Sequence, residues 1–121
     1  MNHESTITTD SKVLAGVRYT IRRMSFAGRM ELLTTIGDAM KRQEFLAASP
    51  HVADSAEAAL LRMSMENELL RWGFVGVDGL RINGNEATLE AILNDGPEEL
   101  AREILGAIEK QTRLTADEEK N

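Results

Sequence analysis

The residue types that most often perform catalysis or bind metals are scarce in this chain of 121 residues. Histidine occurs only at His3 and His51, and cysteine is absent, so no cluster has the spacing of a metal site. The same scarcity removes serine–histidine and cysteine–histidine nucleophile pairs. We therefore expect no catalytic residue, no metal ligand and no cofactor-binding residue, and a protein that is not an enzyme.

A group of acidic residues could in principle perform acid–base chemistry. Glu98, Glu99 and Glu103 fall within about one turn of a predicted helix, and paired carboxylates can act as general acid and base. Negative charges at the start of a helix also interact favourably with the helix dipole. That second interpretation accounts for the glutamates on a solvated face without any catalytic role.

The charge of the chain is unevenly distributed. The formal net charge is −6, but residues 1–50 carry seven Lys/Arg against five Asp/Glu, and residues 51–121 carry seven against fifteen. An acidic protein is repelled by nucleic acid backbones. One group of basic side chains nevertheless leaves a small nucleic-acid-binding regulator open as an alternative function. Its members are Arg18, Arg22, Arg23, Arg29, Lys41 and Arg42.

The sequence pattern predicts an α+β fold, mostly α, with about three principal helices, an N-terminal strand and a small β-hairpin. Residues 1–11 are polar and predict a disordered N-terminal arm, and residues 12–121 predict a single helical α+β domain. Alternating residues over 17–22 indicate a strand. The Asn83-Gly84 pair within residues 74–87 indicates a tight hairpin turn, and this hairpin is a candidate to pair with the first strand.

Helix signals divide the rest of the chain. Ser25 is a predicted N-cap for a helix over about 26–47, which Ser49-Pro50 should end. A second helix is predicted over about 55–72, with Gly73 as its left-handed cap. A short helix should follow Thr88, and a longer one should start after Asp95-Gly96-Pro97. The spacing of Thr115 and Glu118 is typical of a capping box for a final short turn.

Four large apolar residues on the first predicted helix are the candidate partner-binding residues. Apolar residues three or four positions apart share one helical face. Such a face packs into the core, or it receives the apolar side of a partner helix. We expect partner contacts here, with core packing as the alternative. The residues are Phe26, Met30, Leu33 and Met40.

The chain also lacks the signals of export and membrane insertion. Residues 1–11 contain no apolar region of a signal peptide, and no apolar run is long enough to span a bilayer. The absence of cysteine fits a reducing compartment. The sequence therefore predicts a soluble cytoplasmic protein.

Several short pieces together resemble small proteins of tailed bacteriophages and prophages that act as tail assembly chaperones. The resemblance covers about residues 17–121. The pieces are Arg23-Met24-Ser25-Phe26, Arg29-Met30-Glu31-Leu32, Trp72-Gly73, Gly79-Leu80, Ile82-Asn83-Gly84, Ala87-Thr88, Gly96-Pro97-Glu98-Glu99-Leu100 and the tail from Leu114 to Asn121.

This resemblance implies a non-catalytic protein of the host bacterial cytoplasm with two protein partners. Such a chaperone keeps the long tape measure protein soluble, and its frameshifted longer form recruits tail tube protein. It does not remain in the finished virion. A structural virion protein, such as a minor tail or head–tail connector component, is the alternative from another class.

The residues Glu119-Lys120-Asn121 bear on the longer form. They can be encoded by GAA-AAA-AAC, which contains A-AAA-AAC, a heptamer on which ribosomes slip into the −1 frame. We therefore expect a −1 frameshift near these codons.

Overall fold

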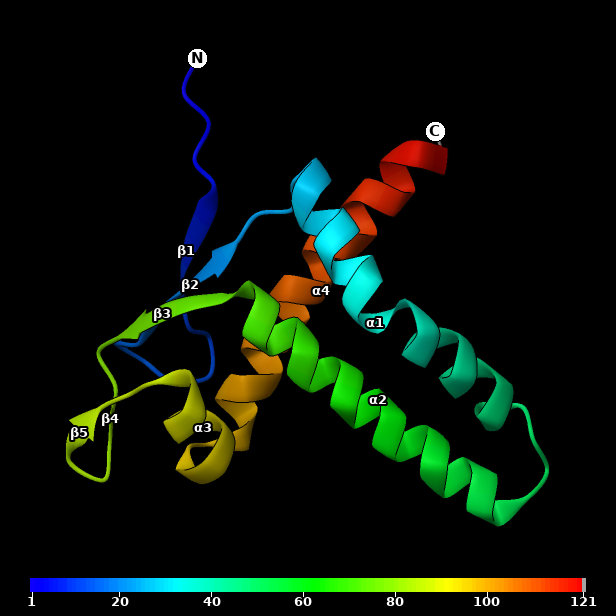
Figure 1. Ribbon diagram of the computed structural model, residues 1–121. Coiled ribbons are helices and arrows are strands. Elements are labelled where there is room, and N and C mark those ends of the chain that lie inside the picture. The colour runs from blue at the N-terminus through cyan, green and yellow to red at the C-terminus, as the bar shows by residue number, and fades with distance from the viewer. Residues whose placement is uncertain (121) are drawn as a thin grey trace. The chain divides into compact units, whose positions relative to one another are not determined.

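The computed structural model describes the backbone of residues 1–120 and the side chains of residues 1–112. This part of the chain is a mixed α+β structure, mostly α, with four helices and small antiparallel sheets (Figure 1). The predicted fold class is confirmed. In chain order the elements are β1 (Thr6–Asp10), β2 (Arg18–Arg22), α1 (Phe26–Ala47), α2 (Val52–Gly73), β3 (Phe74–Asp78), β4 (Arg81–Ile82), β5 (Asn85–Glu86), α3 (Leu89–Asp95) and α4 (Glu98–Lys120).

These elements divide into two compact units, where the sequence suggested one domain over residues 12–121. The sheet unit comprises Met1–Met24 and Gly73–Asn121, and it contains all strands together with α3 and α4. The two-helix unit comprises Ser25–Trp72, and it contains α1 and nearly all of α2.

The three-stranded sheet has the order β1-β2-β3, and both pairs of strands are antiparallel. Strand β1 corrects the expectation of a disordered arm over residues 1–11. Its β-branched residues match β2: Ile7 lies opposite Ile21, and the hydroxyl oxygens of Thr8 and Thr20 are 2.8 Å apart in a hydrogen bond. The polar composition of residues 1–11 predicts disorder. Threonine is polar but also favours strands, so these residues can form a sheet that has one face in water.

The β4–β5 hairpin turns at Asn83-Gly84, as predicted. Both residues have positive φ angles, 53° at Asn83 and 82° at Gly84, which a two-residue type I′ turn requires. The strand that pairs with β2 is β3, however, and not a strand of this hairpin. Gly79, which also has φ 82°, redirects the chain between β3 and β4.

The core of the sheet unit forms where α4 packs against β2 and α3. Tyr19 and Ile21 of β2 are buried, as is Ile92 of α3. Three α4 side chains are 0% exposed: Leu100, Ile104 and Ile108. Their spacing of four places them on one face of the helix. Each such side chain contributes about 1.5–3 kcal/mol when it leaves water.

Gly73 corrects a second expectation. It is the last residue of α2, and it is not among the residues with positive φ, so it is no left-handed cap. Its role is steric instead. A Cβ atom at this position would lie 2.7 Å from side-chain atoms of the fully buried Ile108. Only glycine lets the chain pass this close to α4.

In the two-helix unit, the ends of α1 agree with the prediction. Ser25 accepts a 2.9 Å hydrogen bond from the Gly28 N–H as its N-cap, and α1 ends before Ser49-Pro50. Helix α2 begins at Val52, earlier than predicted, and Asp54 accepts a 2.7 Å bond from the Ser49 hydroxyl. The two helices run antiparallel across this short connection (Figure 1).

The last helices also follow the sequence signals. Thr88 caps α3 by accepting a 3.2 Å bond from the Ala91 N–H, and α4 begins directly after Pro97. The final turn expected at Thr115–Glu118 does not form a separate element, because α4 continues to Lys120. The capping-box side chains of Thr115 and Glu118 lie outside the described side chains.

Candidate partner-binding surface

The candidate residues Phe26, Met30, Leu33 and Met40 lie on one stripe of α1, here called the α1 stripe. Helix α1 is continuous through all four positions. Steps of four, three and seven residues return to nearly the same direction around a helix with 3.6 residues per turn. Gly37 falls between Leu33 and Met40 on the same stripe, and a Cβ there would meet nothing within 4 Å. The stripe is therefore open along its length.

All four side chains of the α1 stripe are exposed. The exposed fractions are 87% for Phe26, 60% for Met30, 51% for Leu33 and 40% for Met40. The alternative that these residues form the core is therefore wrong. The residues of α1 that are buried lie on a neighbouring stripe, which includes Leu32 and Ile36. Both stripes have helical periodicity, so the sequence pattern alone does not distinguish them.

More large apolar side chains are exposed elsewhere in the two-helix unit. Phe45 near the end of α1 is exposed, and so are Val52, Leu60 and Met63 of α2. Single exposed apolar residues are normal on protein surfaces, but a series of them along one helix marks a site of interaction. The α1 stripe also contains two methionines, whose flexible thioethers adapt to irregular partners.

A shallow hollow opens between α1 and α2, within the two-helix unit. It has a volume of about 190 Å³. Its lining combines two apolar side chains with four polar or charged ones. They are Leu32 and Trp72, and Glu31, Thr35, Glu68 and Arg71. The hollow is smaller than the pockets of about 300–1,000 Å³ that typically bind small molecules.

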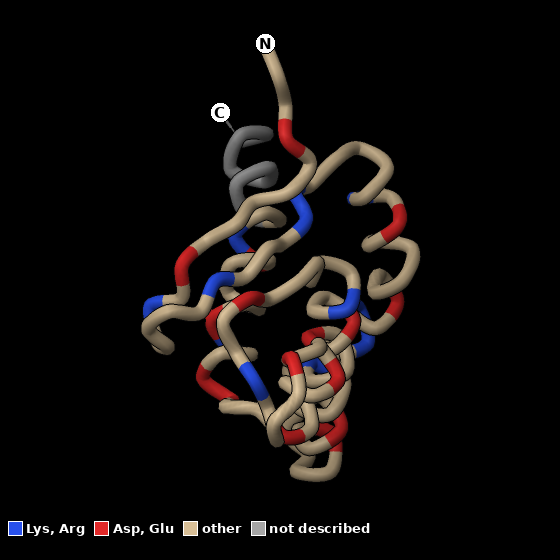
Figure 2. The backbone as a smooth tube through the Cα atoms, turned by 90° about the vertical axis from the view of Figure 1, so that its left-hand side faces the viewer, with Lys and Arg blue, Asp and Glu red and all other residues tan. Residues whose placement is uncertain are grey.

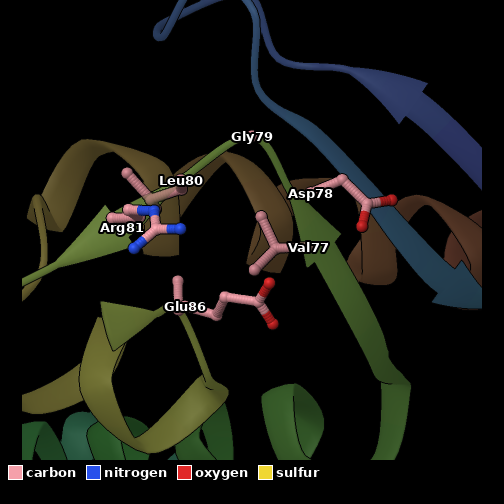
Figure 3. A pocket seen from close by; sticks show the side chains of 7 residues that line it. Val77, Asp78, Gly79, Leu80, Arg81 and Glu86 are labelled. Atoms are coloured by element: carbon pink, nitrogen blue, oxygen red, sulfur yellow. The ribbon is translucent and has the colours of Figure 1, made fainter. Parts of the chain in front are cut away.

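The sheet unit has a larger hollow beside the turn from β3 to β4. It has a volume of about 360 Å³. Figure 3 shows Val77, Arg81 and Glu86 around it, with the Asp78 carboxylate turned away. Arg81 donates a 3.3 Å hydrogen bond to the Gly84 carbonyl, so its guanidinium supports the hairpin turn. The lining offers no buried polar group that would orient a ligand.

Two members of the predicted basic group are paired with carboxylates. Arg18 forms a 3.0 Å ion pair with Asp10, and Arg42 forms a 2.7 Å ion pair with Glu57. The members also belong to different units, because Arg22 and Arg23 lie in the sheet unit and Arg29 lies in the two-helix unit. Figure 2 shows basic and acidic positions interleaved along the chain. Local pairing lowers the attraction of these residues for phosphates.

Glu103 has a structural role that the sequence did not indicate. Its Oε1 accepts a 2.6 Å bond from the Ser11 hydroxyl, and its Oε2 accepts a 2.7 Å bond from the Lys12 N–H. A residue of α4 thereby holds the loop between β1 and β2. Burial raises the pKa of the nearby Tyr19 phenol, and the negative charge of Glu103 raises that pKa further. Nothing in the local sequence links Glu103 to a loop about ninety residues earlier.

The described residues contain no group of three or more His, Cys, Asp or Glu side chains placed to hold a metal ion. His3 and His51 are both exposed. Among the helices of the described chain, none combines the length and apolar composition needed to cross a bilayer. Comparisons with models of protein families, with curated proteins and with solved structures found no significant match to this chain.

Proposed function

We propose that this protein is a non-catalytic tail assembly chaperone of a tailed bacteriophage or prophage. It keeps the tape measure protein soluble in the host bacterial cytoplasm and aids assembly of the tail tube. Its α1 stripe receives the apolar face of an amphipathic helix of that client. A helix laid into an apolar surface is read through anchors at helical spacing, and this interaction requires no cofactor.

The exposure of the α1 stripe is the observation that carries the proposal. Four large apolar side chains on one helix face contact water in this chain, although covering a Leu, Met or Phe side chain stabilises a protein by about 1.5–3 kcal/mol. A second point of support is the resemblance described above. Its first piece ends at Phe26, where the α1 stripe begins.

The direct test is co-expression with the tape measure protein encoded beside this gene. The measurement is the fraction of that protein that remains in solution after centrifugation. The expected result is a soluble complex with this chain and aggregation without it. A double variant, Met30→Ser with Leu33→Ser, should lower affinity for the client about tenfold or more. Both positions are exposed, so the variant should fold as the parent does.

A matched control comes from α2. Leu60→Ser with Met63→Ser also removes two exposed apolar side chains, but these lie outside the α1 stripe. This control should retain the client in solution. If both double variants lose the client equally, the binding site is not the α1 stripe. If the client is equally soluble without this chain, the chaperone proposal itself is wrong.

Two further measurements separate the proposal from its alternatives. Mass spectrometry of purified particles should not find this chain, whereas a minor tail or connector protein would be present in them. The nucleotide sequence of codons 119–121 should read GAA-AAA-AAC in front of an overlapping −1 frame if a longer form is made. Codons GAG-AAG-AAC lack the slippery heptamer, so they would contradict the frameshifted longer form. The co-expression experiment would then be the test of client binding.

A nucleic-acid-binding regulator is the less supported alternative. Such a protein should bind with an affinity that falls steeply as salt is raised. The ion pairs of Arg18 and Arg42 with neighbouring carboxylates argue against it.

A further inference from the structure

Within the described part of the chain, the backbone groups at the outer edge of strand β1 have no hydrogen-bond partner. Strand β1 is an outer strand of the sheet, and β2 is its one neighbour there. The Arg23 N–H donates to the Ser5 carbonyl and the Ser11 N–H donates to the Val17 carbonyl, each at 2.8 Å, so the odd-numbered residues face β2. Because alternate residues of a strand point their backbone groups in opposite directions, Thr6, Thr8 and Asp10 direct theirs to the free edge.

The side chains of these same residues lie on the solvated face of the sheet. Thr8 bonds to Thr20 there, and Asp10 pairs with Arg18. Glu4 continues the same alternation toward the N-terminus and is exposed, and its carboxylate accepts a 2.8 Å bond from the exposed Asn2 amide. Lys12 lies beyond the other end of the strand and is also exposed.

Charge distinguishes the ways in which two such edges can pair with each other in antiparallel fashion. A pairing centred on Thr8 places Glu4 of one copy opposite Lys12 of the other, twice, and brings the two Thr8 residues together. A pairing centred on Ile7 would instead place Glu4 opposite Asp10, and like charges directly opposite are destabilising. The Thr8-centred register therefore has complementary charges at both ends.

The segment that contains β1 and β2 does not share the acidity of the chain as a whole. Residues 1–24 carry four basic and two acidic side chains, although the net charge of the chain is −6. At the β1 edge itself, Glu4 and Asp10 are acidic and Lys12 is basic. Asp10, which would face Thr6 of the other copy, forms an ion pair with Arg18 at 3.0 Å, and this pair partly offsets its negative charge. Two copies can thus approach along this edge without a concentration of like charge.

We propose that the β1 edge is a self-association surface, on which a second copy of this chain pairs antiparallel about Thr8. The two three-stranded sheets then form one continuous sheet. Backbone groups of Thr6, Thr8 and Asp10 supply about six hydrogen bonds. The pairing of backbone groups between the two copies ends at Asp10, because the Lys12 N–H donates its hydrogen bond to Glu103. Lys12 therefore contributes to the contact through its side chain. These residues belong to the sheet unit, and those of the α1 stripe belong to the two-helix unit, so the proposal stands independently of the proposed function.

The expected association is weak, because one pair of short strands covers little surface. A dissociation constant of roughly 10 µM to 1 mM is expected. Sedimentation equilibrium of the full chain over this concentration range measures it. The variant Thr8→Pro removes the outward N–H without touching the ladder to β2, and it should raise the dissociation constant about tenfold or more. Thr8→Val keeps that N–H and should remain within about twofold of the parent.

Charge exchange tests the register without altering the strand. Glu4→Lys alone and Lys12→Glu alone each place like charges opposite each other, and each should weaken association about three- to tenfold. An equal mixture of the two variants restores both complementary pairs. The mixture should therefore associate about as strongly as the parent chain.

Each possible result of these measurements decides the proposal. A chain that stays monomeric up to about 1 mM overturns it and leaves the edge to a strand of a different protein. A dimer that is unaffected by Thr8→Pro and by both charge variants also overturns it, because the contact then lies elsewhere, for example on the α1 stripe. If Thr8→Pro fails to fold by circular dichroism, the charge variants and their mixture decide alone.

Discussion

The two units of this chain each contain a helix with an apolar stripe, and the two stripes differ sharply in exposure. In the sheet unit, Leu100, Ile104 and Ile108 of α4 are completely covered. In the two-helix unit, Phe26 and Met30 are mostly in contact with water, although they are as apolar as the covered residues. Both patterns have the same helical spacing. The difference shows that spacing locates an apolar face, while the neighbouring elements determine whether that face is covered.

This difference suggests a division of labour. The sheet unit contains nine of the fourteen buried apolar residues of the described chain. Buried side chains stabilise a fold in proportion to the apolar area removed from water. The two-helix unit retains an open apolar surface, which is the property expected of a unit that contacts another chain.

Truncation of a covered residue should have the largest effect. Ile104→Ala leaves a cavity in the sheet unit and should lower the free energy of unfolding by about 2–5 kcal/mol. Leu33→Ala removes a similar volume from the α1 stripe and should change the free energy of unfolding by less than about 0.5 kcal/mol. Urea unfolding of both variants measures the contrast. Equal losses would mean that the α1 stripe is packed in solution.

The two helical glycines should respond in opposite directions. Gly73→Ala places a methyl group 2.7 Å from the Ile108 side chain and should destabilise the sheet unit by about 1–3 kcal/mol. Gly37→Ala meets nothing within 4 Å and should stabilise α1 by about 0.5–1 kcal/mol. Thermal unfolding followed by circular dichroism distinguishes the two. Ile108→Ala removes all three side-chain atoms that this methyl group would meet, so it should cost less stability in the Gly73→Ala background than in the parent chain.

The contact between Glu103 and the β1–β2 loop should have an intermediate effect. Glu103→Gln removes the charge that strengthens the bonds from the Ser11 hydroxyl and the Lys12 N–H, and it should cost about 1–2 kcal/mol. Glu99→Gln, at an exposed position in the same helix, is the control and should cost less than about 0.5 kcal/mol. Hydrogen exchange of the Lys12 amide should speed up in the first variant only.

The smallest effect concerns pH and the single tyrosine of the chain. Because the pKa of Tyr19 is raised in the folded protein, the unfolded chain loses this proton first as pH rises above about 10. Tyr19 should not affect the free energy of unfolding below that pH. As the pH rises from the ordinary pKa of tyrosine to the raised pKa of Tyr19, the free energy of unfolding should decrease. The slope should be absent in Tyr19→Phe. Absorbance titration of the phenolate, folded and in urea, gives both pKa values.

Much of the fold could be predicted because it depends on local signals. Ser25 places the start of α1, Pro50 enforces its end and Asn83-Gly84 specifies a hairpin turn, each through backbone chemistry within a few residues. The helical stripe containing Phe26 and Met30 was also recognised from its spacing.

The features that escaped prediction depend on residues distant in sequence. Strand β1 has the composition of a polar arm, but it forms because Ile7 and Thr8 pair with residues of β2. Glu103 is matched to Ser11 only once α4 lies against the sheet. Gly73 resembles a helix cap in sequence, but its reason for being glycine is Ile108.

The register of the sheet has a consequence for how this chain can be taken apart and rebuilt. Ile21 near the end of β2 lies directly opposite Phe74 at the start of β3, so the whole of Ser25–Trp72 leaves and re-enters the sheet at adjacent points. Ser25–Trp72 is therefore an insertion between two paired strands. A tight turn could replace it while the strands on either side stay paired, and a different pair of helices could be grafted between the same two anchor points.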